Sequence, residues 1–235
     1  MGFAGFSREG LQFLADLAVN NERAWFQPRK AEYERLLKHP LEELCVALGE
    51  RFAARDIPLV ADPARSPFRF YRDVRFSKDK SPYKTNVAAS FPWAGGGPGG
   101  YFSLGPGEIY AGGGVWHPEP SQLAAWRAAV ASRPAEVHAV LEGPGFVGTF
   151  GQVEGERLKR MPAGFPADHP DAELLKLKDI IFSRRLADED AFSPSLPDRL
   201  ADDFVAAMPV FRLLAGLAVT PAPAGGASVE DVAGD

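Results

Sequence analysis

Arginine and lysine side chains that could bind a phosphate or a carboxylate gather in one charged segment, residues 68–85, with the sequence FRFYRDVRFSKDKSPYKT. Its ionisable side chains are Arg69, Arg72, Arg75, Lys78, Lys80 and Lys84, with Asp73 and Asp79. They sum to a net charge of +4, whereas the whole chain carries −5, so the 20 cations and 29 acids elsewhere leave −9. A local positive site on an acidic protein suits a small anionic ligand better than a long nucleic acid.

The alternation of residue types predicts a β-strand over residues 68–76. One face would carry Phe68, Phe70, Arg72, Val74 and Phe76, and the other Arg69, Tyr71, Asp73 and Arg75. Arg72 is then a charge on an apolar face, where an unpaired charge is costly. Because arginine keeps its proton, we expect Arg72 to have a carboxylate partner from another segment or to lie at the mouth of an anion-binding pocket.

Asp73 lies between two arginines on the other predicted face and could hold Arg69, Arg75 or both in a fixed fork geometry. Such a pairing either prepares the arginines for an anionic ligand or is a structural network of cross-strand ion pairs, and both interpretations stay open. The predicted ligand-binding residues are Arg69, Arg72, Asp73, Arg75, Lys78, Asp79, Lys80, Tyr83 and Lys84. In this hypothesis Arg72, Arg75 and Lys80 hold the anionic group, Asp73 orients the arginines, and Tyr83 closes the site.

Three functions follow from the charged segment. The first is binding of a small phosphate- or carboxylate-bearing molecule, with or without a reaction. The second is a non-catalytic protein-interaction module whose charges form a structural network. The third is RNA or single-stranded DNA binding, because basic and aromatic residues alternate, although a pI of about 5.5 disfavours nucleic acid.

A second group of cations occurs late in the chain and offers a test of the anion site. Its members are Arg157, Lys159, Arg160, Lys176, Lys178, Arg184 and Arg185. Convergence of these side chains on Arg69 and Arg75 would favour an anion site, whereas scattering over the surface would indicate solvation alone.

Metal and cofactor chemistry have weak signals. The histidines His39, His117, His138 and His169 are scattered and match no common ligand spacing. The glycine run at residues 94–100 lacks the Lys-Ser/Thr ending of a phosphate-binding loop and reads as a hairpin connection. Cys45 falls on an apolar helical stripe with Leu41, Leu44, Leu48 and Phe52, which predicts a buried side chain. We therefore expect no metal and no cofactor.

The chain predicts an α+β fold in which an antiparallel or mixed sheet is flanked by helices. In the first third, we predict a helix over residues 7–19 capped by Ser7, a second helical segment capped by Asn21, and a third helix that begins at Pro40. Later in the chain, we predict helices after Pro120 and from Pro134, a helical turn at residues 171–175 and a terminal helix over residues 197–217. The predicted strands are 68–76, 86–93, 101–104, 108–114, 146–150, 157–161 and 178–185, with glycines 112–114 marking a bulge or a close backbone approach. We expect one globular domain over residues 1–219 and a disordered tail over 220–235.

No apolar run approaches the roughly 20 residues of a membrane span, and the first residues, MGFAGFS, lack the pattern of a signal peptide. The lone cysteine forms no internal disulfide. We expect a soluble cytoplasmic protein with no membrane partner, and the sequence indicates no particular oligomeric state.

The charged segment also resembles the signature of a known family. The pattern Arg69-x-x-Arg72-Asp73-x-Arg75-Phe76, followed by Asp79-Lys80-x-x-Tyr83, is similar to that of domain of unknown function 2461, an uncharacterised family widespread in bacteria and also found in fungi. Further similar segments are Asn20-Asn21 with Trp25-Phe26 and Tyr33, Gly112-Gly113-Gly114-x-Trp116-x-Pro118, Leu158-Lys159-Arg160 with Pro162-x-Gly164-Phe165, and His169-Pro170 with Leu174-Leu175-Lys176. The resemblance spans nearly the whole chain. It implies a single globular domain with no assigned activity and gives no catalytic residues to carry over.

Overall fold

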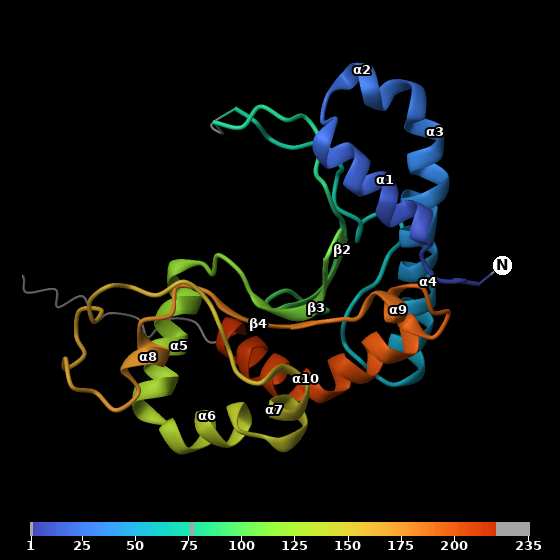
Figure 1. Ribbon diagram of the computed structural model, residues 1–235. Coiled ribbons are helices and arrows are strands. Elements are labelled where there is room, and N and C mark those ends of the chain that lie inside the picture. Colours follow the sequence, from blue (N-terminus) through green and yellow to red (C-terminus); the bar gives the residue numbers. More distant parts are fainter. Residues whose placement is uncertain (1, 76–77, 220–235) are drawn as a thin grey trace, which may run out of the picture.

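A four-stranded antiparallel sheet lies at the centre of the computed structural model, which describes residues 2–75 and 78–219. Its strands are β1 (Val87–Pro92), β2 (Gly99–Gly105), β3 (Glu108–Val115) and β4 (Ile180–Arg185), in the spatial order β1-β2-β3-β4 (Figure 1). Every neighbouring pair is antiparallel, which resolves the predicted antiparallel or mixed sheet as antiparallel. The predicted tail over residues 220–235 lies outside the described residues.

Helices flank the sheet and confirm the predicted α+β class. Before it come α1 (Arg8–Val19), α2 (Arg23–Phe26), α3 (Lys30–Tyr33) and α4 (His39–Ala54), with a 3₁₀ turn at Gln27–Arg29 and a π-helical turn at Glu34–Lys38. Between β3 and β4 lie α5 (Pro120–Ser132), α6 (Pro134–Leu141), α7 (Pro144–Phe150) and α8 (Ala172–Leu175), and α9 (Asp188–Ala191) and α10 (Leu196–Val219) follow β4. None of the helices in the described ranges has the length and hydropathy needed to cross a membrane.

Local sequence signals explain several of these helices. The predicted cap of α1 is present, since Ser7 Oγ accepts a hydrogen bond from the Gly10 N–H at 3.1 Å. The predicted apolar stripe of α4 is buried, including Cys45. Burial, with the nearby carboxylates Glu42 and Asp62, raises the pKa of the Cys45 thiol to about 12, so this cysteine is a packing residue rather than a nucleophile.

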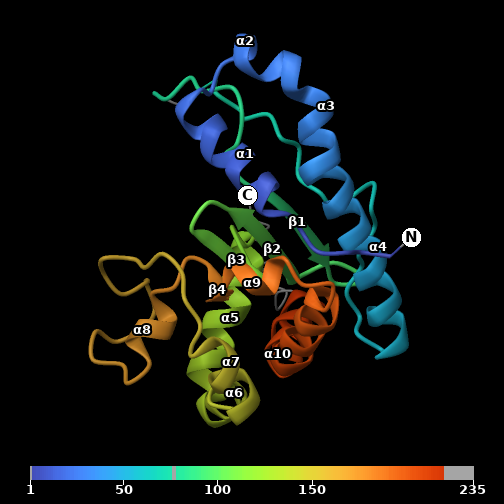
Figure 2. The same cartoon turned by 45° about the vertical axis from the view of Figure 1, so that its right-hand side comes forward.

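One face of the sheet carries the hydrophobic core. Phe91 of β1 packs against Phe52 of α4, with ring centroids 5.9 Å apart, and against Phe204 of α10 at 5.8 Å. At the other edge, Phe182 of β4 packs against Phe211 of α10 at 5.3 Å. Figures 1 and 2 both show α10 along this face. Burial of each phenylalanine stabilises the fold by about 1.5–3 kcal/mol, so this layer fixes the sheet against the helices.

The other face of the sheet, which we term the open face, is polar and only partly covered. Its central row crosses the four strands as Ser90, Tyr101, Gly112 and Ser183. Tyr101 is 37% exposed, and the two serines are half-buried. In Figure 1 this concave face is turned toward the charged segment and away from α4 and α10.

Glycines in β3 permit β4 to approach closely, as the glycine run predicts. A Cβ atom on Gly112 would lie 2.2 Å from the Phe182 carbonyl oxygen, and one on Gly114 would lie 2.1 Å from the Ile180 carbonyl oxygen. Gly114 also has a φ of 120°, which side chains disfavour. The β3–β4 pairing therefore depends on these two glycines.

Three of the predicted strands are wrong. Residues 146–150 form part of α7, because Pro144 favours a helix start and Phe146 and Phe150, one helical turn apart, both pack against Phe182. Residues 157–161 form only a single bridge, between Arg157 and Leu177.

The charged segment is not a continuous strand either. Pro67 bridges Ala89 of β1, and beyond that point the chain pairs with its own return segment through a bridge between Tyr71 and Tyr83. It projects from the sheet beside the end of α1 (Figure 1). Alternation alone does not identify the pairing partner of a strand. Phe68 is 46% exposed although it was predicted to face the core, and Phe76 lies outside the described residues.

His138 ties α6 to the turn before α8. Its Nδ1 lies 2.8 Å from Glu142 Oε1 and its Nε2 lies 2.6 Å from Asp171 Oδ1. The hydrogen bond to Asp171 and then that to Glu142 raise the pKa of His138 above its usual value of 6.5. The folded protein thus favours the protonated imidazole.

We expect this site to make stability depend on pH. Its contribution is complete below about pH 6.5, the pKa of an unfolded histidine, and is lost as the pH rises through the higher folded pKa. The measurement is the free energy of unfolding in urea across this range, in which His138→Gln lacks this part of the pH dependence and the exposed His39→Gln retains it. Equal pH slopes in wild type and His138→Gln would contradict the assignment.

Candidate functional site

An aromatic cluster holds the charged segment against the N-terminal helices. The ring of Tyr83 is 1% exposed and lies 4.3 Å from Phe26 and 5.4 Å from Phe70, measured between ring centroids. Phe70 in turn lies 4.1 Å from Tyr33. The prediction that Tyr83 closes the site is therefore not supported, because its ring is part of the core beneath the charged segment. Aromatic burial of this kind is worth more than exposed ion pairs.

The Asn21 side chain fixes the backbone of the same tyrosine. Asn21 Nδ2 donates to the Tyr83 carbonyl oxygen at 3.0 Å, and the Tyr83 N–H donates to Asn21 Oδ1 at 3.0 Å. The predicted capping role of Asn21 is wrong, since Glu22 occupies the cap position of α2 and forms no side-chain cap. The amide instead acts like a neighbouring strand, because one carboxamide offers both a donor and an acceptor.

A cleft of about 400 Å³ lies between the charged segment and the end of α1. It is lined by Ala18, Asn21, Arg72, Asp79, Ser81, Tyr83, Lys84, Thr85 and Asn86. Four predicted ligand-binding residues, Arg72, Asp79, Tyr83 and Lys84, are thus brought together. The lining residues that the sequence analysis missed are Ala18, Asn21, Ser81, Thr85 and Asn86, of which Asn21 belongs to one of the segments that resemble the family.

Arg72 has the carboxylate partner that its position predicts. Its Nη1 donates to Asp79 Oδ2. Asp79 also accepts hydrogen bonds from the Ser81 hydroxyl at 2.6 Å and the Ser81 N–H at 2.9 Å. The Ser81 hydroxyl and then Arg72 hold the pKa of Asp79 well below its usual value. Asp79 is therefore a firm anion that orients Arg72 at the cleft.

Lys84 differs from the arginines of the segment. Arg69 lies 3.9 Å from Asp73 and Arg72 pairs with Asp79, but no carboxylate in the described part of the chain lies within ion-pair distance of the Lys84 ammonium. Its Nζ lies 5.2 Å from the centre of the Phe68 ring. Burial and then the nearby charge of Arg69 lower the pKa of Lys84. This partly buried cation thus lacks a counter-ion at a cleft wall.

The Asp73–Arg75 fork forms as predicted but stands outside the cleft lining. Arg75 Nε donates to Asp73 Oδ1 at 3.0 Å, and Nη2 donates to Oδ2 at 2.7 Å. These bonds lower the pKa of Asp73. The Arg75 side chain is 77% exposed, so its ion pair with Asp73 contributes little to stability.

The remaining predicted lysines lie elsewhere on the segment. Lys80 Nζ donates to the Val74 carbonyl oxygen at 2.9 Å, and Lys78 is exposed. Neither lines the cleft. The predicted role of Lys80 in holding the ligand is thus not supported by the cleft geometry.

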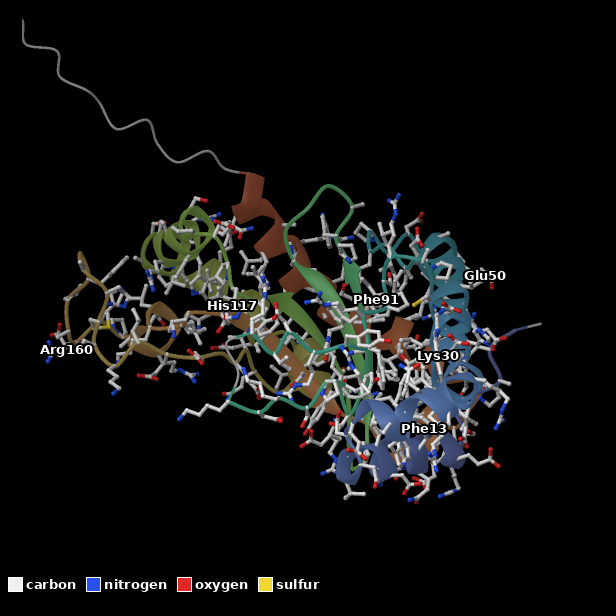
Figure 3. All side chains as sticks on the ribbon, turned by 90° about the horizontal axis from the view of Figure 1, so that it is seen from above. Phe13, Lys30, Glu50, Phe91, His117 and Arg160 are labelled. Carbon is white, nitrogen blue, oxygen red and sulfur yellow. The ribbon has the colours of Figure 1, made fainter. Side chains whose placement is uncertain are left out.

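The late cations do not converge on Arg69 and Arg75. Arg184 pairs with Asp203 at 2.8 Å, and Arg157 and Lys176 both pair with Glu173, at 3.3 and 3.0 Å. Arg160 lies at the opposite end of the molecule from Phe13 of α1 (Figure 3). The second cationic group therefore adds nothing to the anion site.

Histidines do not assemble a metal centre in residues 2–75 and 78–219, where no group of three His, Cys, Asp or Glu side chains is placed to hold an ion. His117 has a φ of 51° and its N–H donates to Asp179 Oδ1 at 2.8 Å. The His169 Nδ1 accepts from the Asp171 N–H at 3.0 Å. Both contacts hold loops in place.

The two hydrogen bonds between Asn21 and the backbone of Tyr83, which we term the Asn21 clamp, should stabilise the charged segment. We expect Asn21→Ala to lower the free energy of unfolding by about 1–3 kcal/mol, because two part-buried backbone groups lose their partners. Asn20→Ala is the matched control, since that side chain is exposed and makes one bond, to the Asp16 carbonyl oxygen at 2.8 Å, and should change stability by about 0.5 kcal/mol or less. Equal losses in urea denaturation would show that the clamp has no special role.

The Tyr83 hydroxyl is buried without a hydrogen-bond partner among the described residues. A buried, unsatisfied hydroxyl costs about 1–3 kcal/mol. We therefore expect Tyr83→Phe to raise the free energy of unfolding by about 1 kcal/mol or more, measured by thermal or urea denaturation. A loss of stability would mean that this hydroxyl has a partner in solution.

Comparison with known proteins agrees with the resemblance carried by the charged segment. A family model described as conserved hypothetical protein (DUF2461) matches residues 9–212. No curated protein and no solved structure matches the chain. The matched residues extend from α1 into α10 and include both the charged segment and the cleft. Since the match covers far more than half of the sequence, the chain belongs to the DUF2461 family.

Proposed function

We propose that the protein binds a small molecule through a phosphate or carboxylate group in the cleft between the charged segment and α1. The observation that carries the proposal is Lys84, a partly buried cation at the cleft wall without a carboxylate partner in the described residues. Partial removal of a cation from water costs free energy when no counter-ion is present. An anionic ligand would supply the missing charge.

Arg72 supports the same proposal. A guanidinium has five N–H donors, and the hydrogen bond to Asp79 uses one of them. Asp79 is itself held by Ser81, so the arginine is oriented before any ligand arrives. Preorganised arginines bind phosphate and carboxylate with less loss of conformational freedom.

Asn86 supplies a polar group at the sheet end of the cleft. Its Nδ2 donates to Ser103 Oγ at 2.8 Å, which fixes the side chain. Its amide oxygen accepts hydrogen bonds and thus favours a ligand that also carries hydroxyl or amine groups.

The interaction-module hypothesis has its own supporting observation, the Asp73–Arg75 fork, which is exposed and is not part of the cleft lining. In that hypothesis the segment meets another protein, and no small anion is required. The nucleic-acid hypothesis has less support, because the residues outside the charged segment carry a net charge of −9, derived from 20 cations and 29 acids.

Thermal unfolding against a panel of phosphates, nucleotides and carboxylates tests the proposal. A ligand present at 100 times its Kd adds about 2.7 kcal/mol to the stability of the native state. We expect a rise in Tm for the wild type, loss of that rise in a folded Lys84→Gln variant, and its retention in Lys78→Gln. The two variants remove the same charge from the same segment, but only Lys84 lines the cleft.

No rise in Tm with any compound would contradict the proposal and favour the interaction module. A response only to long oligonucleotides, with affinity that falls steeply with salt, would favour nucleic acid instead.

A further inference from the structure

Two exposed aromatic rings lie together at the open face of the sheet, and one of them, Phe68, lies beside Lys84. Phe68 is 46% exposed and Tyr101 is 37% exposed, and their ring centroids lie 6.2 Å apart. Large apolar side chains of this fold are otherwise mostly buried. Exposed aromatic pairs next to cations are typical of binding surfaces rather than of solvated ones.

Small residues on β1 bring the two rings together. The Phe68 N–H donates to the Ala88 carbonyl oxygen at 2.9 Å, which places Phe68 along the outer edge of β1. Tyr101 of β2 is the cross-strand partner of Ser90 on the other side of β1. Because Ala88 and Ser90 have short side chains, the rings approach each other across the strand.

On its β3 side, Tyr101 is directly opposite a residue without a side chain. Its cross-strand partner on β3 is Gly112, and the partner of Gly112 on β4 is Ser183. No side chain larger than serine therefore stands beside Tyr101 in its row of the open face. The Tyr101 ring itself is 37% exposed, and a planar group could stack on its exposed part.

Lys84 joins this aromatic pair to the cleft. Its Nζ lies 5.2 Å from the centre of the Phe68 ring, and the same side chain lines the cleft. An anionic group bound by Lys84 thus lies close to the aromatic surface. A ligand that carries a ring next to its anionic group could contact both.

We propose that the ligand of the cleft is an aromatic anion, a planar ring system that bears a phosphate or carboxylate, such as a nucleoside monophosphate. Its ring packs against Tyr101 and Phe68, and its anionic group contacts Lys84 and Arg72. This inference rests on the proposed anion site and adds the chemical class of the rest of the ligand.

A small molecule fits better than a nucleic acid strand. A strand needs a continuous track of cations along its phosphates, but Arg69 and Arg75 both lie against Asp73, and Arg72 lies against Asp79. One cation at the cleft, Lys84, lacks such a pairing within the described residues, which suits a single anionic group.

Matched pairs of compounds test the proposal on the full chain. Adenosine monophosphate is compared with ribose 5-phosphate, and phenylacetate with acetate, by isothermal titration. We expect the aromatic member of at least one pair to bind at least tenfold more tightly than its non-aromatic partner. Tyr101→Leu should abolish that difference without changing the affinity of the non-aromatic compound. Trp116→Leu, which removes an exposed aromatic residue that stacks on His117, is the control and should preserve it.

The outcomes separate this inference from the anion site on which it rests. Equal affinities within each pair, with binding lost in Lys84→Gln, would overturn the aromatic ligand and leave the anion site intact. Absence of binding by all four compounds would contradict the proposal of an aromatic ligand. If no compound of the wider anion panel raised the Tm either, the proposed anion site would be contradicted as well. A preference for oligoadenylate over adenosine monophosphate would overturn the small ligand in favour of a strand.

Discussion

The hydrogen-bonded pairing between the Asn21 side chain and the backbone of Tyr83 is the interaction on which the charged segment depends. These residues stand 62 positions apart in the chain, and two bonds of 3.0 Å join them. Tyr71 bridges Tyr83 on one side of the segment, and the Asn21 side chain satisfies the N–H and the carbonyl oxygen of Tyr83 on the other side. The clamp sets where Lys84 emerges, one residue later, and thus which part of the cleft wall carries a cation without a carboxylate partner among residues 2–75 and 78–219.

Burial, rather than ion pairing, holds the charged segment in place. The rings of Phe26, Phe70 and Tyr83 are buried together, and each buried aromatic ring contributes more than an exposed ion pair, whose worth is about 0–1 kcal/mol. The segment therefore does not need its charges for stability. The ion pairs with Asp73 and Asp79 orient the arginines of the segment and add little to its stability.

Much of the fold was predictable because its signals are local. Ser7, the apolar stripe around Cys45, and the glycine-rich hairpins specify their own elements. The strand predicted over residues 68–76 failed because alternation reports which sides of a chain are apolar but not which segment pairs with it. The need of Arg72 for a carboxylate was predictable from electrostatics, whereas the part played by Asn21 was not. Its role arises only when α1 is brought beside a segment distant in sequence, and no local pattern encodes that contact.

The pairing of β3 with β4 constrains both faces of the sheet. The core on the covered side needs Phe182 of β4 to reach α7 and α10. In the same structure, β4 lies so close to β3 that a side chain at Gly112 would collide with the Phe182 carbonyl oxygen. Glycine at that position means that the residue directly opposite Tyr101 on β3 has no side chain. The pairing that packs Phe182 against α7 and α10 thus also excludes a side chain directly opposite Tyr101, and a larger residue at position 112 would require a change in the β3–β4 pairing.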